Sequence, residues 1–208
     1  MNADALIAAA RHLAARGLSP GSSGNLSIRV GDRVLLTPTG SSLSRVEAGD
    51  LAELSLDGTQ LAGGRPTKEW AVHLAPYAAD AALAAVVHLH APASTALSCL
   101  APAEDGLADL PAYTPYRVMS LGEVPLVPYA RPGDAALGAE VGSRIASGHR
   151  ALLLANHGSV TAAATLDRAV DLAEELEASA ALALALAGRD ARELTPAEQA
   201  ALRSPLHG

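Results

Sequence analysis

Two short apolar runs that end beside histidines constrain the fold of this chain more than any other feature. One reads Ala85-Val86-Val87-His88-Leu89-His90, and the other reads Ala151-Leu152-Leu153-Leu154-Ala155 and is followed by Asn156-His157-Gly158. Apolar runs of this length are typical of strands that are buried on both faces. The sequence therefore predicts a sheet with both runs in its interior and histidines at their ends.

The remaining segments show helical and extended patterns in irregular order. Helical periodicity and capping residues predict helices over residues 4–16, 67–79, 91–100, 134–146 and 167–187, with a last short helix from Thr195. Alternation predicts strands over residues 26–30, 34–37 and 124–129, with short strands between residues 51 and 61. The regular alternation of a doubly wound fold is absent. We therefore expect one α/β domain over residues 1–208, with a central mixed or antiparallel sheet flanked by helices.

Composition and charge exclude several classes of partner. Half of the 208 residues are apolar, which allows a sizeable core, and the formal net charge is −7. This charge argues against a nucleic acid or an anionic membrane as the main partner. A single cysteine, Cys99, allows no disulfide within the chain, and the first residues do not resemble a signal peptide. We expect a soluble cytoplasmic protein.

The chain is almost free of lysine. Of its 15 basic residues, 14 are arginine and one is Lys68. Codon bias towards arginine is the simplest explanation for the general lack of lysine, and the survival of one lysine by chance is the alternative to a specific role. Arginine does not replace lysine where a compact ammonium is needed, so Lys68 is a candidate for a specific contact with an anion.

The histidines form a candidate metal site. His88 and His90 are two residues apart on a predicted strand, so both imidazoles point to the same face of the sheet. His157 ends the second apolar run, and Glu69 lies at a predicted helix start, where the helix dipole favours its charge. Three imidazoles and a carboxylate suit Zn²⁺ with one position left for substrate. The alternative is histidines packed at strand ends and a glutamate that only starts a helix.

Three short segments are candidates for anion binding. Gly24-Asn25 and Thr39-Gly40 are glycine-containing loops beside strand ends, where backbone N–H groups can face an anion. Thr67-Lys68 precedes Glu69 and adds a hydroxyl and an ammonium. The alternatives are ordinary turns and a lysine in solvent.

Five strings carry a family resemblance. They are Gly24-Asn25-Leu26-Ser27, Leu36-Thr37-Pro38-Thr39-Gly40, Pro66-Thr67-Lys68-Glu69, Val87-His88-Leu89-His90 and Ala155-Asn156-His157-Gly158. Their order and spacing resemble those of the class II aldolase/adducin family, which includes L-fuculose-phosphate aldolase, over almost the whole chain. The resemblance implies that His88, His90 and His157 bind zinc. It implies that Glu69 is a ligand in the resting enzyme and an acid or base once substrate displaces it. The phosphate-binding positions of the family fall on Gly24, Asn25, Thr39, Gly40, Thr67 and Lys68.

Longer strings point to one branch of this family. The aldolase has two serines before the glutamate where this chain has Thr67-Lys68. Residues 18–27, 66–69, 96–100, 114–119 and 127–134 resemble the 3-oxo-tetronate 4-phosphate decarboxylases. This resemblance implies metal-dependent decarboxylation of a small phosphorylated sugar acid to dihydroxyacetone phosphate and CO₂ through a metal-stabilised enediolate. Zn²⁺ is the expected metal, and Mn²⁺ or Co²⁺ would also fit the ligands.

The resemblance also implies roles for individual residues. Lys68 would pair with the substrate carboxylate or phosphate, and Glu69 would manage the proton at C2. Tyr116, or else Tyr113, would be an acid that a neighbouring subunit of a homotetramer contributes. The alternatives are a sugar-phosphate aldolase, which Lys68 disfavours, and a 4-epimerase. A non-catalytic adducin-like interaction protein or a sugar-phosphate-binding module is an alternative of another class.

Overall fold

A single sheet organises the computed structural model, which describes residues 2–103 and 105–203. Within these residues the sheet has eight strands in the order β4-β3-β2-β1-β5-β8-β7-β6. The pairs are antiparallel except for β6 and β7, which run parallel. The strands are β1 (Asn25–Val30), β2 (Arg33–Leu36), β3 (Ala52–Ser55), β4 (Gln60–Gly63), β5 (Ala85–Leu89), β6 (Leu126–Val127), β7 (Ala151–Leu154) and β8 (Gly158–Ala163). The predicted mixed sheet is confirmed.

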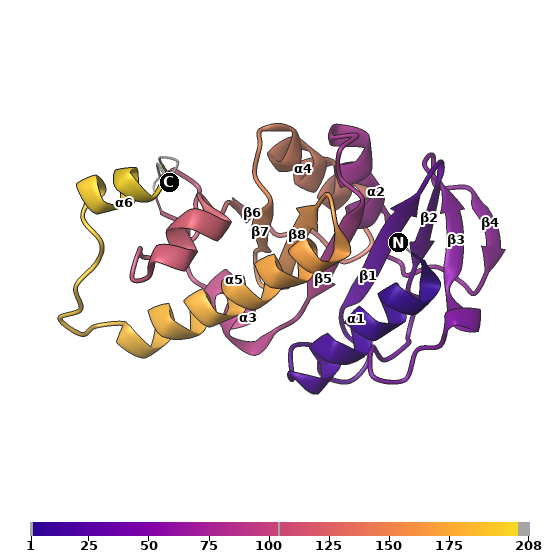
Figure 1. Ribbon diagram of the computed structural model, residues 1–208, viewed down its shortest axis with the longest axis horizontal. Helices are drawn as coiled ribbons and strands as arrows, with labels where there is room; N and C mark the ends of the chain where they lie inside the picture. The colour runs from indigo at the N-terminus through magenta and orange to yellow at the C-terminus, as the bar shows by residue number, and fades with distance from the viewer. Residues whose placement is uncertain (1, 104, 204–208) are drawn as a thin grey trace, which may run out of the picture.

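Helices cover both faces of the sheet. The helices are α1 (Ala3–Ala15), η1 (Ala48–Asp50), α2 (Trp70–Ala79), α3 (Pro92–Ser98), η2 (Arg117–Leu121), α4 (Ala135–Ala146), α5 (Leu166–Leu186) and α6 (Pro196–Arg203). Figure 1 shows α1 and α5 crossing one face, while η2 and α6 lie beyond the β6 end of the sheet. The core accordingly has two parts, one beneath α1, α3 and α5 and one beneath α2 and α4. Among the described residues, no helix has the length and apolar character that a membrane crossing needs.

Strand alternation decides which side chains face the α2 side of the sheet. On β5, Val87 and Leu89 pack in the core beneath α1 and α5, whereas Val86 belongs to the core beneath α2 and α4. His88 has the same parity as Val86, so it faces α2. In the antiparallel register Asn25 of β1 lies directly opposite His88. The buried polar side chains of β1 and β5 therefore gather beneath the start of α2.

Three of the differences from the sequence prediction concern the sheet and the start of α2. Strand β8 was not predicted, because its small residues carry neither a strong apolar run nor a clear alternation; it is fully buried because it pairs with β5 on one side and β7 on the other. Helix α2 begins at Trp70 instead of residue 67, after a turn that the Trp70 N–H closes on the Thr67 carbonyl. Strand β6 has two residues instead of six, since Pro125 and Pro128 flank it and cannot donate to a ladder.

Candidate metal centre and active site

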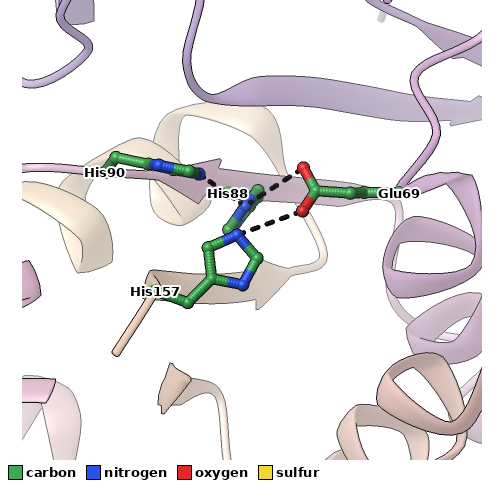
Figure 2. A group of neighbouring side chains, drawn as sticks. All are labelled: Glu69, His88, His90 and His157. Atoms are coloured by element: carbon green, nitrogen blue, oxygen red, sulfur yellow. Dashed lines mark hydrogen bonds and ion pairs between the residues drawn. The ribbon is translucent and has the colours of Figure 1, made fainter. Parts of the chain in front are cut away.

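Three separate segments bring four ligand-type side chains together on the α2 side of the sheet. Strand β5 and the residue after it supply His88 and His90, the turn between β7 and β8 supplies His157, and the residue before α2 supplies Glu69. One ligand-type atom from each of the four lies within 4.8 Å of the others. Figure 2 shows the three imidazoles and the carboxylate converging on one point.

The ligand-type atoms of this cluster are close enough to one another to bind a single ion. His88 Nε2 and His90 Nε2 are 3.1 Å apart, Glu69 Oε2 is 3.4 Å from His88 Nε2, and Glu69 Oε1 is 3.1 Å from His157 Nε2. His88 is completely buried, Glu69 and His157 are buried, and His90 is half-buried. Short distances between the ligand-type atoms and burial of most of the side chains suit a divalent cation.

The tautomer of His88 is fixed by the backbone of β8. Its Nδ1 lies 2.8 Å from the Ser159 carbonyl, which can only accept, so Nδ1 carries the proton. Nε2 of the neutral ring therefore presents a lone pair to the cluster. This donation from the second ring nitrogen to a carbonyl is the usual way in which a protein orients a metal-binding histidine.

His157 gives a direct test of whether the cluster fits a metal. Both of its ring nitrogens are buried and have no hydrogen-bond partner among the described residues, although Nε2 faces the Glu69 carboxylate. A buried polar group without a partner costs about 1–3 kcal/mol. A cation ligated by Nε2 would remove part of that cost, so the residues present fit the divalent metal that the sequence predicts.

Helix α3 connects the two histidine segments. It begins just after His90, and the carboxylate of Glu177 on α5 accepts the N–H groups of Ala93 and Ser94 at its start. At its end the Ser98 carbonyl accepts the Asn156 N–H at 3.0 Å, and the Ser98 hydroxyl accepts the His157 N–H at 3.3 Å. The helix thus fixes the spacing between β5 and the turn that carries His157.

The turn at His157 leaves no room for a larger residue after the histidine. A Cβ on Gly158 would lie 2.3 Å from the Leu89 carbonyl oxygen, because β8 starts against the end of β5. Asn156, on the other side, has a φ of +55°, a conformation that asparagine tolerates better than most residues. Both residues are therefore needed to direct His157 towards the cluster.

The surroundings set the charge of the cluster. Burial acts to raise the pKa of Glu69, but the nearby His157 and His88 rings and the hydrogen bond from Asn25 outweigh it and hold the pKa below its ordinary value. Burial, together with the neighbouring His88 and His157 rings, lowers the pKa of His90 to about 4. At neutral pH the site therefore combines a carboxylate with a neutral His90, which is the form that binds metals.

A cavity of about 510 Å³ opens onto this cluster. Glu69, His90 and His157 line it, and His88 lies behind them without exposed surface. All six residues predicted for anion binding line the same cavity: Gly24, Asn25, Thr39, Gly40, Thr67 and Lys68. Lys68 is exposed at the mouth, whereas Asn25 and Thr67 are buried in the wall. The cavity therefore joins the four-residue cluster to Lys68 and the loops that were predicted to bind an anion.

A family model for the class II aldolase and adducin N-terminal domain matches residues 4–184. The chain belongs to the class II aldolase and adducin family. It is 47% identical over 181 residues to the 3-oxo-tetronate 4-phosphate decarboxylase of Pectobacterium atrosepticum, an alignment that covers 86% of this chain and 82% of the relative.

Solved structures agree with this class II aldolase assignment. YgbL from Escherichia coli superposes with a TM-score of 0.91 at 41% identity and 97% coverage of both chains. An L-fuculose 1-phosphate aldolase superposes with a TM-score of 0.85 at 28% identity, covering 96% of this chain and 93% of the aldolase.

The two candidate tyrosines lie away from the cavity of this class II aldolase domain. Tyr116 is 68% exposed and lines a different cavity with Glu175 and Ser179. Tyr113 is half-buried and lines neither of these two cavities. Within one chain, neither tyrosine is brought to the cluster.

Several residues of the site were not predicted as site residues from the sequence. Ser22, Ser23, Pro132 and Asn156 also line the cavity. The two serines lie in the same glycine- and serine-rich loop as Gly24, so composition could have indicated them. Pro132 comes from a distant loop; it lies in the string 127–134 that carries the family resemblance, but its residue type did not indicate a site.

His73 was also not predicted, although a signal for it exists. Glu69, His73 and Tyr77 recur at intervals of four residues, which places them on one face of α2. His73 is completely buried on that face, and Tyr77 is nearly so. A stripe of three polar side chains on a buried helix face indicates a polar network beneath the helix.

Proposed function

We propose that this chain is a metal-dependent carboxy-lyase that converts a 3-oxo-tetronate 4-phosphate to dihydroxyacetone phosphate and CO₂. The observation that carries the proposal is the single cavity in which Lys68 and the glycine loops face the cluster of Glu69, His90 and His157. The name of the relative from Pectobacterium atrosepticum supports the same reaction.

The reaction divides into two steps that the residues of the cavity can serve. A 3-oxo-tetronate 4-phosphate is a β-keto acid, so the C1–C2 bond breaks, CO₂ leaves, and the electron pair stays on C2 in conjugation with the C3 carbonyl. The resulting enediolate then takes a proton at C2. A divalent metal held by His88, His90 and His157, with Glu69 as a further ligand, would supply a Lewis acid for the negative charge that develops on the substrate oxygens.

The ligand set supports zinc without excluding other ions. Imidazole nitrogens and a carboxylate are ordinary zinc ligands. The same nitrogen and oxygen donors also accept Mn²⁺ or Co²⁺, since no thiolate is present in the cluster.

Lys68 and the surrounding loops would hold the two anionic ends of the substrate. The chain is acidic overall, so a substrate with both a carboxylate and a phosphate needs local positive charge, and Lys68 supplies an ammonium at the mouth of the cavity. Gly24-Asn25, Thr39-Gly40 and Thr67 add N–H and hydroxyl groups around it. In this proposal Lys68 pairs with the carboxylate or the phosphate and orients the breaking bond.

Glu69 would manage the proton at C2. Its carboxylate is buried beside the histidines and accepts a hydrogen bond from Asn25, so it is already within the cluster when substrate arrives. Tyr116 is proposed as a second acid that reaches the cavity of a neighbouring subunit in a homotetramer. Its exposed ring, away from the cavity of its own chain, supports that arrangement.

The remaining proposals concern the organisation of the protein. The 208 residues would act as one domain, with a small phosphorylated sugar acid rather than nucleic acid or membrane as partner. A reducing, cytoplasmic location suits the free and exposed thiol of Cys99.

Aldol cleavage of a sugar phosphate is the second candidate. The structural likeness to an L-fuculose 1-phosphate aldolase favours it, and an enediolate arises there too when a C–C bond to an aldehyde breaks. A 4-epimerase is a further alternative within the family. Lys68 distinguishes the reactions, because a substrate with a carboxylate has a use for an added cation that a neutral sugar chain lacks.

The test is release of CO₂ and dihydroxyacetone phosphate from a 3-oxo-tetronate 4-phosphate that is generated in place, with metal-loaded enzyme. Turnover that disappears in His88→Ala would support both the reaction and the role of the cluster. No CO₂ from well-metallated protein would exclude decarboxylation, and aldol cleavage would then be assayed. Metal binding without turnover of any sugar phosphate would leave the adducin-like, non-catalytic alternative.

A further inference from the structure

A continuous line of buried hydrogen bonds ends on the carboxylate of the candidate site. Tyr77 Oη lies 2.8 Å from Ser27 Oγ, which lies 2.9 Å from His73 Nδ1. His73 Nε2 lies 2.5 Å from Asn25 Oδ1, and Asn25 Nδ2 lies 3.1 Å from Glu69 Oε2. The line runs from the second half of α2, across β1, and back to the residue that precedes the same helix.

The chemistry of the groups fixes the direction of every bond in this line. A carboxylate only accepts, so the Asn25 amide turns its N–H to Glu69 and its oxygen to His73. That oxygen also only accepts, so His73 donates from Nε2. The other ring nitrogen, Nδ1, must then accept the hydroxyl proton of Ser27, whose oxygen accepts from Tyr77.

The protonation states of the buried groups agree with this direction. His73 has no exposed surface, and this burial lowers its pKa to about 3. Burial raises the pKa of Tyr77. At neutral pH His73 is uncharged and Tyr77 keeps its proton. Each hydrogen bond in the line therefore keeps the donor and the acceptor assigned above.

We propose that His73 is a positioning residue for Glu69, acting through the amide of Asn25. By holding the amide oxygen, His73 prevents rotation of the Asn25 side chain and keeps one N–H on Glu69 Oε2. The second N–H of the amide is left for an oxygen of a bound anion in the cavity that Asn25 lines. The Asn25 side chain thus couples the anion-binding wall of the cavity to the Glu69 carboxylate. This inference rests on the role proposed above for Glu69.

Substitution of His73 tests the coupling. His73→Leu removes the donor, and we expect a 10- to 100-fold loss in metal affinity and in kcat per bound metal, which is the range for orienting partners of a metal site. His73→Gln keeps an N–H donor and should recover part of both losses. Val72→Ala, on the same helix and equally buried but outside the line, controls for lost stability and should leave both values unchanged. A His73→Leu enzyme with wild-type metal affinity and wild-type kcat per bound metal would overturn the proposal.

The tautomer of His73 provides a readout that needs neither substrate nor turnover. In ¹⁵N NMR spectra of the metal-loaded protein, the imidazole signals of His73 are those that disappear in His73→Gln. From pH 5 to pH 9 these signals should be those of a neutral ring that is protonated at Nε2. A ring protonated at Nδ1, or one that titrates in this range, would overturn the proposal. If the enzyme does not decarboxylate the expected substrate, the tautomer and the metal affinities still decide the role of His73, so the two proposals fail separately.

Discussion

His88 and His90 face one another with their Nε2 atoms 3.1 Å apart, while His88 donates its ring proton in the opposite direction to the Ser159 carbonyl. His88 Nε2 therefore holds a lone pair, which either accepts a proton from His90 or shares a cation with it. In the second case both lone pairs point at the same ion. The close approach of these two nitrogens is therefore explained either by a proton from His90 or by a bound metal ion between them.

Loss of His88 should abolish metal binding. We expect His88→Ala to retain far less than the stoichiometry of about one divalent ion per chain that a single site implies. His12→Ala is the matched control, because His12 lies on α1 and pairs with Glu174 at the surface. Elemental analysis after gel filtration gives the metal content. Full occupancy in the His88 variant would contradict the assignment of the cluster.

Lys68 should contribute to catalysis only for anionic substrates. Replacement by methionine is expected to lower kcat/KM for a phosphorylated sugar acid about 10- to 100-fold, since a hydrogen bond to a charged group contributes about 1.5–3 kcal/mol. The control is Arg65→Ala, which removes a nearby exposed cation that does not line the cavity. Steady-state kinetics of the two variants make the comparison. An equal loss of kcat/KM in the Lys68 and Arg65 variants would mean that the overall charge of the protein, and not a contact from Lys68, promotes the reaction.

The buried His73 should make the metal-free protein sensitive to acid. Its pKa is about 3 when folded and about 6.5 when unfolded, so between these values the unfolded chain binds the extra proton. The free energy of unfolding should therefore fall as the pH drops from 6.5 towards 3, by up to about 1.4 kcal/mol per pH unit from this residue, with no contribution above that range. Urea unfolding in the presence of a chelator measures the slope. His73→Gln should show a shallower slope, and equal slopes would refute the prediction.

Gly158 should tolerate no side chain. An added Cβ meets the Leu89 carbonyl oxygen at 2.3 Å, so Gly158→Ala forces β8 away from β5. We expect a loss of about 1–3 kcal/mol in stability, the usual cost of overpacking, together with weaker metal binding because His157 precedes this residue. Gly49→Ala has open space around its Cβ and is the control. Thermal unfolding of both variants would show whether the close approach is real.

A complementation experiment tests whether Tyr116 acts across a subunit interface. Tyr116→Phe and His88→Ala are each expected to be nearly inactive alone. If the tyrosine of one subunit serves the metal site of another, dissociated and reassembled mixtures should regain activity, because some sites then combine an intact tyrosine with intact ligands. Tyr113→Phe is the control and should retain activity. Mixtures that stay inactive would place the acid elsewhere.

The local placement of the candidate site residues could be predicted from the sequence, whereas the sheet that orients them depends on the pairing of distant strands. The spacing of His88 and His90 was sufficient to put both rings on one face, because alternation along a strand is a local property. Strand β8 gave no such signal, yet its Ser159 carbonyl fixes the tautomer of His88. The Asn25 amide, predicted as an anion contact, also holds Glu69, which depends on its position opposite His88 in the sheet.

The sequence by itself determined the residue types and the local geometry: two strands that end in histidines, a glutamate at a helix start, one lysine, and glycine loops that allow close approach. Only the tertiary structure decided that these segments meet in one cavity, that His73 supports Asn25, and that Tyr116 lies outside the cavity of its own chain. The physical reason is that helix and strand periodicity are set by neighbouring residues. Convergence of distant segments is set by strand order and by which small residues let two backbones approach, as Gly158 does beside Leu89.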